Sequence, residues 1–387
     1  MVKRNKYMNV PEIRFKGLDK TWNKKTLDEL VQLNSGMDYK HLCNGNIPVY
    51  GTGGYMLSVN AALSYDKDAI GIGRKGTINK PYILKAPFWT VDTLFYAIPR
   101  KYNNLQFCNC IFQRIDWLKY DESTGVPSLS KNIINSIEVN CAPSYDEQQK
   151  IASYFQSLDS LIQTTSKKLV SLKQIKDASL QSMFPQEEET VPKVRFKGFE
   201  EEWSLKYVFE LLCERNELSP QSPEFPLMAF IANNGIAEKG ERYDRSALVN
   251  DVINKQYKRT YYGDFIYSSN NLETGSIGLN TYGKATISPV YSIFYCTLNS
   301  DSNFVGYCMT RKSFIKEMIK WRQGVMYGQW RIHEKDFLRI KVLVPSLPEQ
   351  QQIGTYFRNL DQQISLQTQR LEKLKQIKTA CLDKMFV

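Results

Sequence analysis

Two stretches of the chain carry apolar residues at intervals close to seven, with polar residues between them. In the first stretch, residues 147–183, the apolar positions are Phe155, Leu158, Ile162, Leu169, Leu172 and Met183. In the second, residues 349–385, they are Phe357, Leu360, Ile364, Leu371, Leu374 and Met385. Neither stretch contains proline, and Gly354 is the only glycine, so the pattern predicts two helices of about 37 residues, each about 55 Å long.

Each predicted helix is preceded by a start signal. Ser144 with Glu147, and Ser346 with Glu349, have the spacing of a capping box, in which the two side chains satisfy free N–H groups of the first turn. A single helix of this kind would expose its apolar stripe to water. We therefore expect the two helices to pair with each other.

The chain also repeats itself. The phrase Val-Pro-x-x-Arg-Phe-Lys-Gly begins at Val10 and again at Val191, and a tryptophan follows each time, at Trp22 and Trp203. The stretches 143–184 and 345–386 are identical at about half of their positions, including Leu-Lys-Gln-Ile-Lys at 172–176 and 374–378. The sequence is therefore a tandem duplication of one unit that consists of a short lead-in, a variable block and a long helix.

The variable blocks, residues 24–142 and 204–344, differ at nearly all positions. Both contain short β-branched and aromatic runs between Gly, Asn and Asp turns, which predicts a mixed α/β structure. The expected strands include 88–96 and 290–296, and a run before each long helix at 133–139 and 337–344. The segment 185–192 is charged and flanked by prolines, as a linker would be.

Composition favours a polyanionic partner. The 387 residues carry a formal net charge of +11, which favours nucleic acid over a membrane surface. No apolar run is long enough to cross a bilayer and the start has no apolar secretory region, so we expect a cytoplasmic location. The eight cysteines contain no C-x-x-C pair and indicate free thiols in a reducing compartment.

The repeated helix openings at 143–151 and 345–353, the Leu-Lys-Gln-Ile-Lys and Met-Phe endings, and the lead-ins resemble the specificity subunits of type I restriction-modification systems. The resemblance covers essentially the whole chain. It implies a target recognition domain in residues 1–142, a conserved spacer helix and linker in 143–190, a second recognition domain in 191–344 and a second spacer helix in 345–387. The implied fold is mixed α/β, with two globular recognition domains, two long antiparallel coiled-coil-like helices and a pseudo-twofold internal repeat.

The resemblance also implies function. Each recognition domain would read one half of a bipartite target in double-stranded DNA, and the helices would set the gap and dock two methyltransferase subunits. Restriction subunits, which act as motor and nuclease, would be further partners. This chain would hold no cofactor and no metal: S-adenosylmethionine would bind the methyltransferase subunits, and ATP and Mg the restriction subunits. The chain itself would be no enzyme.

Residue chemistry within the blocks suggests which side chains meet DNA, because cations suit phosphates and Arg, Asn and Gln suit base edges. In the first domain the candidates are Arg74, Lys75, Lys80, Tyr82 and Ser128. In the second they are Lys255, Lys258, Arg259, Tyr261, Asn270, Asn271, Tyr327, Gln329 and Arg331. The candidates for the spacer and docking helices are Phe155, Leu158, Ile162, Leu169, Leu172, Phe357, Leu360, Ile364, Leu371 and Leu374.

Other interpretations stay open at this point. Residues 71–76 spell G-x-G-x-x-G, but Pro81 and β-branched residues follow, which disfavours the helix that a dinucleotide site needs; a solvated hairpin turn is the other possibility. Asp66 with Asp68, and His333 to Asp336, are weak candidates for a nuclease site. A self-contained methyltransferase or nuclease, and a coiled-coil scaffold without a DNA role, are the rival functions.

Overall fold

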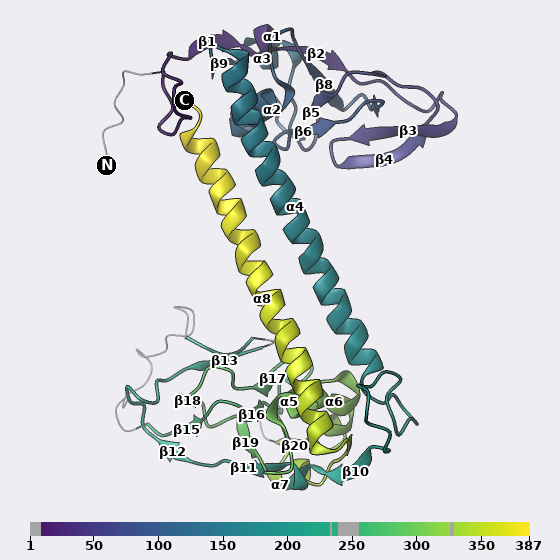
Figure 1. The fold of residues 1–387 in the computed structure, drawn as a ribbon, viewed down its shortest axis with the longest axis vertical. Coiled ribbons are helices and arrows are strands. Elements are labelled where there is room, and N and C mark those ends of the chain that lie inside the picture. Colours follow the sequence, from purple (N-terminus) through teal and green to yellow (C-terminus); the bar gives the residue numbers. More distant parts are fainter. Residues whose placement is uncertain (1–8, 233, 239–254, 326–328) are drawn as a thin grey trace. The chain divides into compact units, whose positions relative to one another are not determined.

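The structure, a computed structural model, describes residues 9–232, 234–238, 255–325 and 329–387 (Figure 1). The chain divides into two compact units. Unit 1 comprises Met1–Lys167 and Thr368–Val387, and unit 2 comprises Lys168–Gln367. Each unit therefore contains one part of each long helix.

Unit 1 is built on a four-stranded sheet in the order β2-β8-β5-β6, with every neighbouring pair antiparallel. A second sheet has the order β4-β3-β7, and β1 pairs with β9. The elements are β1 (Asn23–Thr26), α1 (Leu27–Leu30), β2 (Val31–Ser35), β3 (Asn44–Gly51), β4 (Gly54–Val59), β5 (Ala69–Gly73), β6 (Tyr82–Leu84), β7 (Trp89–Thr90), β8 (Leu94–Pro99), α2 (Leu105–Arg114), the 3-10 helix η1 (Trp117–Tyr120), α3 (Lys131–Ser136), β9 (Glu138–Cys141) and α4 (Tyr145–Ser182).

Unit 2 repeats this plan. Its four-stranded sheet has the order β11-β19-β16-β17, a second sheet has the order β12-β15-β18, and β10 pairs with β22. The elements are β10 (Ser204–Tyr207), the 3-10 helix η2 (Val208–Glu210), β11 (Leu212–Glu214), β12 (Leu218–Ser219), β13 (Ala229–Ile231), β14 (Gly235–Ala237), β15 (Tyr257–Thr260), β16 (Phe265–Tyr267), β17 (Ile277–Leu279), β18 (Ala285–Ile287), β19 (Ser292–Cys296), α5 (Ser302–Met309), α6 (Lys312–Ile319), β20 (Gln323–Val325), β21 (Gln329–Arg331), α7 (Glu334–Phe337), β22 (Lys341–Val344) and α8 (Leu347–Lys384).

The two long helices are confirmed as α4 and α8, with 38 residues each. The predicted strand at 133–139 is wrong for its first half, because Ser130 caps a short helix: its side chain accepts a hydrogen bond from the Ile133 amide. The prediction for 337–344 is wrong for residues 337–340, since α7 ends at Phe337 and the strand begins only at Lys341.

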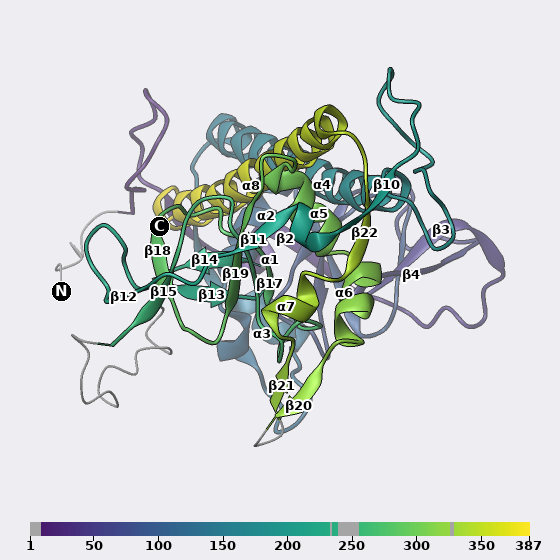
Figure 2. The same cartoon turned by 90° about the horizontal axis from the view of Figure 1, so that it is seen from below.

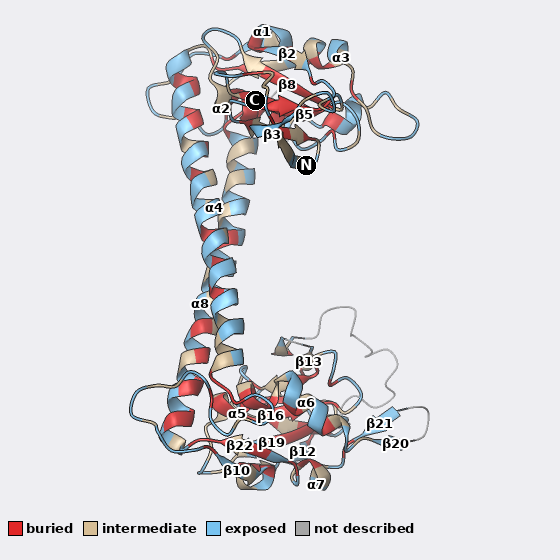
Figure 3. Cartoon of the chain, turned by 90° about the vertical axis from the view of Figure 1, so that its right-hand side faces the viewer, coloured by how far each residue is buried: buried red, intermediate tan, exposed pale blue. Residues whose placement is uncertain are grey.

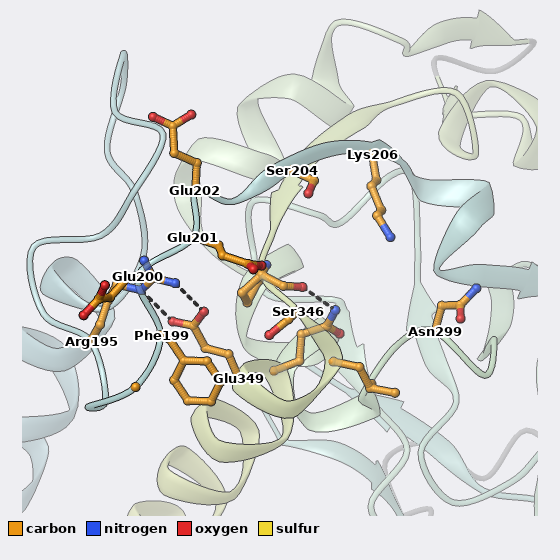
Figure 4. Close-up of a pocket in the computed structure, with 14 residues that line it drawn as sticks. Arg195, Phe199, Glu200, Glu201, Glu202, Ser204, Lys206, Asn299, Ser346 and Glu349 are labelled. Atoms are coloured by element: carbon orange, nitrogen blue, oxygen red, sulfur yellow. Dashed lines mark hydrogen bonds and ion pairs between the residues drawn. The ribbon is translucent and has the colours of Figure 1, made fainter.

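The capping-box prediction is wrong for the glutamates. Glu147 donates its amide to the Ser144 hydroxyl at 3.2 Å, but its carboxylate accepts from Nε and Nη2 of Arg14 at 2.7 and 2.8 Å. Glu349 is held in the same way by Arg195, at 2.9 and 2.7 Å, as the dashed lines in Figure 4 show. A guanidinium matches a carboxylate with two parallel bonds, which a backbone amide cannot do. In each repeat, the arginine of the lead-in and the glutamate of the helix opening therefore form one ion pair.

The Met-Phe endings of the long helices lie in the two cores. In unit 1, the ring of Phe386 packs against Trp22, Phe107 and Phe155. In unit 2, Phe184 packs against Trp203, Phe304 and Phe357. Figure 3 shows buried residues along the strands of each unit, near β5 and β8 in unit 1 and near β16 and β19 in unit 2. The C-terminal end of one repeat thus completes the core that contains the variable block of the other.

We expect Phe386→Ala to destabilise unit 1, and Phe184→Ala to destabilise unit 2, by about 3–5 kcal/mol each, because both rings are buried among aromatic side chains. Hydrogen exchange on the full chain would locate the loss. Phe209→Ala is the control, because Phe209 is 53% exposed. Equal losses in both units from either variant would contradict this assignment of the helix ends.

Candidate nucleic-acid interface

In unit 1, the loop that follows β5 presents two cations to solvent. Arg74 and Lys75 are exposed, while their backbone is fixed: both amides donate to the Thr93 carbonyl, and the Leu129 amide donates to that of Arg74. Lys75 and Ser128 form an isolated antiparallel bridge. The structure therefore brings Arg74, Lys75 and Ser128 together, although more than fifty residues separate the two segments.

These residues line a pocket of about 650 Å³ that also contains Phe95, Glu122 and Lys131. The Arg74 guanidinium lies 5.9 Å from the centre of the Phe95 ring. Within the described part of the chain, neither Arg74 nor Lys75 forms an ion pair with a carboxylate. Both charges therefore stay available to an anionic partner.

The other two candidates of this domain separate. Lys80 is exposed, but the Tyr82 hydroxyl donates to the Gly51 carbonyl at 2.7 Å and its ring packs against Tyr50. Burial, and secondarily the neighbouring Tyr50, raise the pKa of Tyr82. Tyr82 therefore fastens β6 to β3 and has no free hydroxyl to offer to DNA.

Unit 2 has an equivalent edge. The loop after β16 contacts the hairpin β20–β21: the Trp330 amide donates to the Asn270 side chain at 2.6 Å, and the Ile332 amide donates to the Ser269 hydroxyl at 3.0 Å. Figure 2 shows this hairpin extending from the rest of unit 2. Gln329 and Arg331 are exposed on β21, and Asn270 and Asn271 are exposed on the loop.

The Asn271 carbonyl accepts a hydrogen bond from the Ser276 amide, which closes a turn. The Arg331 guanidinium lies 3.6 Å from a carboxylate oxygen of Glu334. Tyr327 lies outside the described residues. The structure thus brings four of the sequence candidates of the second domain together at one edge, namely Asn270, Asn271, Gln329 and Arg331.

The remaining candidates lie on β15 or beside it, in the other sheet. Lys258 is buried and donates to the Tyr291 carbonyl at 3.0 Å; Arg259 donates to the Ser219 hydroxyl and covers the Phe225 ring. The Tyr261 hydroxyl donates to Glu217 at 3.3 Å. Lys255 is exposed. Its ammonium lies 5.8 Å from the centre of the Tyr257 ring, so all four side chains make internal contacts within unit 2.

Sequence reasoning missed two exposed residues. Trp330 lies between Gln329 and Arg331 and is 49% exposed, and Lys131 lines the unit 1 pocket. The exposed part of this ring, on a narrow hairpin, offers a stacking surface to a base. The signal was available, because Trp330 stands between the polar residues Gln329 and Arg331.

The ten helix candidates lie at inward-facing positions. Seven are buried and three, Ile162, Ile364 and Leu374, are half-buried. In unit 1, Phe155 belongs to the same apolar cluster as Met385 and Phe386. In unit 2, Leu172, Phe357 and Leu360 share a cluster with Phe184. These side chains pack the long helices within each unit.

Residues considered for a nuclease site make other contacts in the structure. Asp68 accepts from Lys85 and from the Ala86 amide, and these bonds outweigh burial and lower its pKa. Glu334 accepts from the Ser292 hydroxyl. In the described ranges, no three His, Cys, Asp or Glu side chains are grouped closely enough to hold a metal ion. No described helix combines the length and apolarity needed to span a membrane.

The comparisons with known proteins agree with this duplicated plan. A family profile described as "Type I restriction modification DNA specificity domain" matches residues 19–174 and again 204–376. Two relatives from Methanocaldococcus jannaschii are 23% identical: the type I restriction enzyme MjaVIII specificity subunit, over 80% of this chain and 73% of its own, and the MjaIX specificity subunit, over 83% and 77%.

A crystal structure of the S subunit of a type I restriction-modification system from M. genitalium shares the fold. Its TM-score is 0.67, with 15% sequence identity, and the match covers 98% of this chain and 99% of that one.

Internal and exposed cations should respond differently to substitution. We expect Lys258→Met to lower the free energy of unfolding by about 1–3 kcal/mol, because it removes the hydrogen bond that the buried lysine donates to the Tyr291 carbonyl. Lys75→Ala should change stability by less than about 0.5 kcal/mol, since the side chain is exposed and forms no ion pair with any residue that the structure describes. Urea unfolding measures both. A larger loss from Lys75→Ala would show that Lys75 has a structural role.

Proposed function

This chain belongs to the family of type I restriction-modification DNA specificity domains, and from that premise we propose that it is the specificity subunit of such a system, each recognition domain reading half of a bipartite target in double-stranded DNA. One observation carries the proposal. In unit 1 the loop after β5 contacts the segment before α3, and in unit 2 the loop after β16 contacts the segment before α7. These two edges expose different side chains.

The side chains at these edges have the chemistry that reading DNA requires. In unit 1, Arg74 and Lys75 can bind phosphates or the acceptors of guanine. In unit 2, Gln329 can pair with adenine and Arg331 with guanine, and Asn270, whose side-chain oxygen accepts from Trp330, can still donate from its NH2 group. Equivalent backbones with divergent side chains suit two modules that recognise different sequences. We assign recognition to residues 1–142 and 191–344.

The residues 143–190 and 345–387 would form the spacer, as an antiparallel, coiled-coil-like pair with pseudo-twofold symmetry. Equivalent contacts within the two units support this proposal. In unit 1, Tyr154 of α4 contacts Cys381 of α8; in unit 2, Ser179 of α4 contacts Tyr356 of α8. In both cases, α4 and α8 run in opposite directions. A paired helix holds distance better than a flexible linker does.

Duplicated helices would bind duplicated partners, so we propose that two methyltransferase subunits dock on them. Ile175 and Ile377, from the repeated Leu-Lys-Gln-Ile-Lys motif, are 44% and 37% exposed and available to a partner, unlike the inward-facing candidates. S-adenosylmethionine would bind these partners, and ATP and Mg would bind the associated restriction subunits. The chain itself recognises DNA and is not an enzyme, and its work would place it in the cytoplasm.

Domain exchange tests the proposal. Residues 24–142 are replaced by the corresponding block of another member of the family, and the methylated sites are sequenced in cells that carry the assembled system. We expect one half of the target to change while the other half and the gap remain. The matched control replaces 204–344 and should change the opposite half only. A change of both halves in either exchange would refute independent recognition.

A further inference from the structure

The repeated Leu-Lys-Gln-Ile-Lys motif contains two lysines that the fold treats differently. Lys173 is exposed, whereas the second lysine of each motif crosses to the other long helix. Lys176 of α4 lies 2.6 Å from Oδ1 of Asp361 on α8, within unit 2. Lys378 of α8 lies 2.6 Å from Oδ1 of Asp159 on α4, within unit 1. The second lysine therefore joins the two long helices in each unit.

The same carboxylates also bind the recognition domains. The hydroxyl of Tyr307, on α5, donates to Oδ2 of Asp361 at 2.6 Å. In unit 1, the side-chain amide of Gln106, on α2, donates to Oδ2 of Asp159 at 3.5 Å. Each aspartate thus uses one oxygen for the opposite long helix and the other for the recognition domain. Three elements meet at one side chain.

A second contact holds the start of each of these short helices against a long helix. The Asp301 amide, at the start of α5, donates to the side-chain oxygen of Gln350, and the Asn104 amide, at the start of α2, donates to that of Gln148. Gln350 precedes Asp361 by eleven residues, or about 16 Å along α8. One contact would let the short helix pivot, whereas two contacts define its direction along the long helix.

The two contacts differ in burial. Gln148 and Gln350 are 3% and 2% exposed, so their loss would harm folding. The aspartate–lysine pairs are partly exposed: the side chains of Lys176 and Asp361 keep 26% and 40% of their surface. Pairs at such positions add little to stability. Stability alone therefore does not explain why both repeats retain them.

We propose that Asp159 and Asp361, each with its lysine, are positioning residues that fix the direction of a recognition domain against both long helices and thereby set the number of base pairs between the half-sites. This inference rests on the proposed function, because it concerns the gap in a bipartite target. The lysine ties the aspartate to the second long helix, and Tyr307 or Gln106 ties the same aspartate to the recognition domain. The shorter Tyr307 contact makes the unit 2 junction the tighter one.

The test uses the assembled complex and duplexes that carry the two half-sites found by sequencing methylated DNA, with the native gap or one base pair more or fewer. The readout is the ratio of affinities for the native and altered gaps. We expect Lys176→Ala to lower this ratio about fivefold, or about 1 kcal/mol, while the preferred bases in each half-site stay the same. Tyr307→Phe should lower it more than Gln106→Ala does.

Two variants serve as controls. Lys173→Ala removes the same charge from the same motif at an exposed position and should leave the ratio unchanged. Lys176→Arg keeps the ion pair and should retain the preference. An unchanged ratio in Lys176→Ala, or an equal loss of affinity for all gaps, overturns the inference. A wild-type complex without any preferred gap would instead overturn the proposed function itself.

Discussion

The carboxylates of Glu147 and Glu349 are almost entirely removed from water at the first turn of a long helix, and each is matched there by a bidentate guanidinium. The bond to Glu349 raises the pKa of Arg195. A buried carboxylate that lost its partner would cost about 3–5 kcal/mol, so this pair fixes the lead-in against the helix. The adjacent glutamine then attaches the helix to the recognition domain. Three segments distant in sequence are held at one turn.

The course of the long helices adds a second constraint. Each helix begins against the variable block of its own repeat and ends, through a buried phenylalanine, in the core around the other block. Neither unit is complete without the end of a helix from the other repeat. The aspartate–lysine pairs lie between the start and the end of each long helix. The long helices therefore close the two cores and also carry the pairs that we propose position the recognition domains.

The two long helices and the duplicated plan could be predicted from the sequence, because heptad spacing and duplication are long-range patterns that one chain is enough to show. The partner of Glu147 was not found, since a local capping rule was applied to a residue with a distant partner. The signal existed: both repeats keep Arg14 or Arg195 together with the glutamate. Tyr82 and Lys258 were taken for DNA ligands because residue type alone does not show whether a polar side chain is spent on a neighbouring strand. The pairing of the loop after β5 with Ser128 depends on tertiary structure, which composition does not reveal.

The central claim is that a stiff spacer holds two recognition domains at a fixed separation. The most direct measurement is the distance distribution between two spin labels in solution, one on the exposed Cys43 and one on Leu298→Cys, a position that is 96% exposed. The half-buried cysteines Cys213, Cys296 and Cys381 are replaced by serine. We expect a single narrow distribution that DNA leaves unchanged. A broad distribution that narrows only when DNA binds would contradict the account.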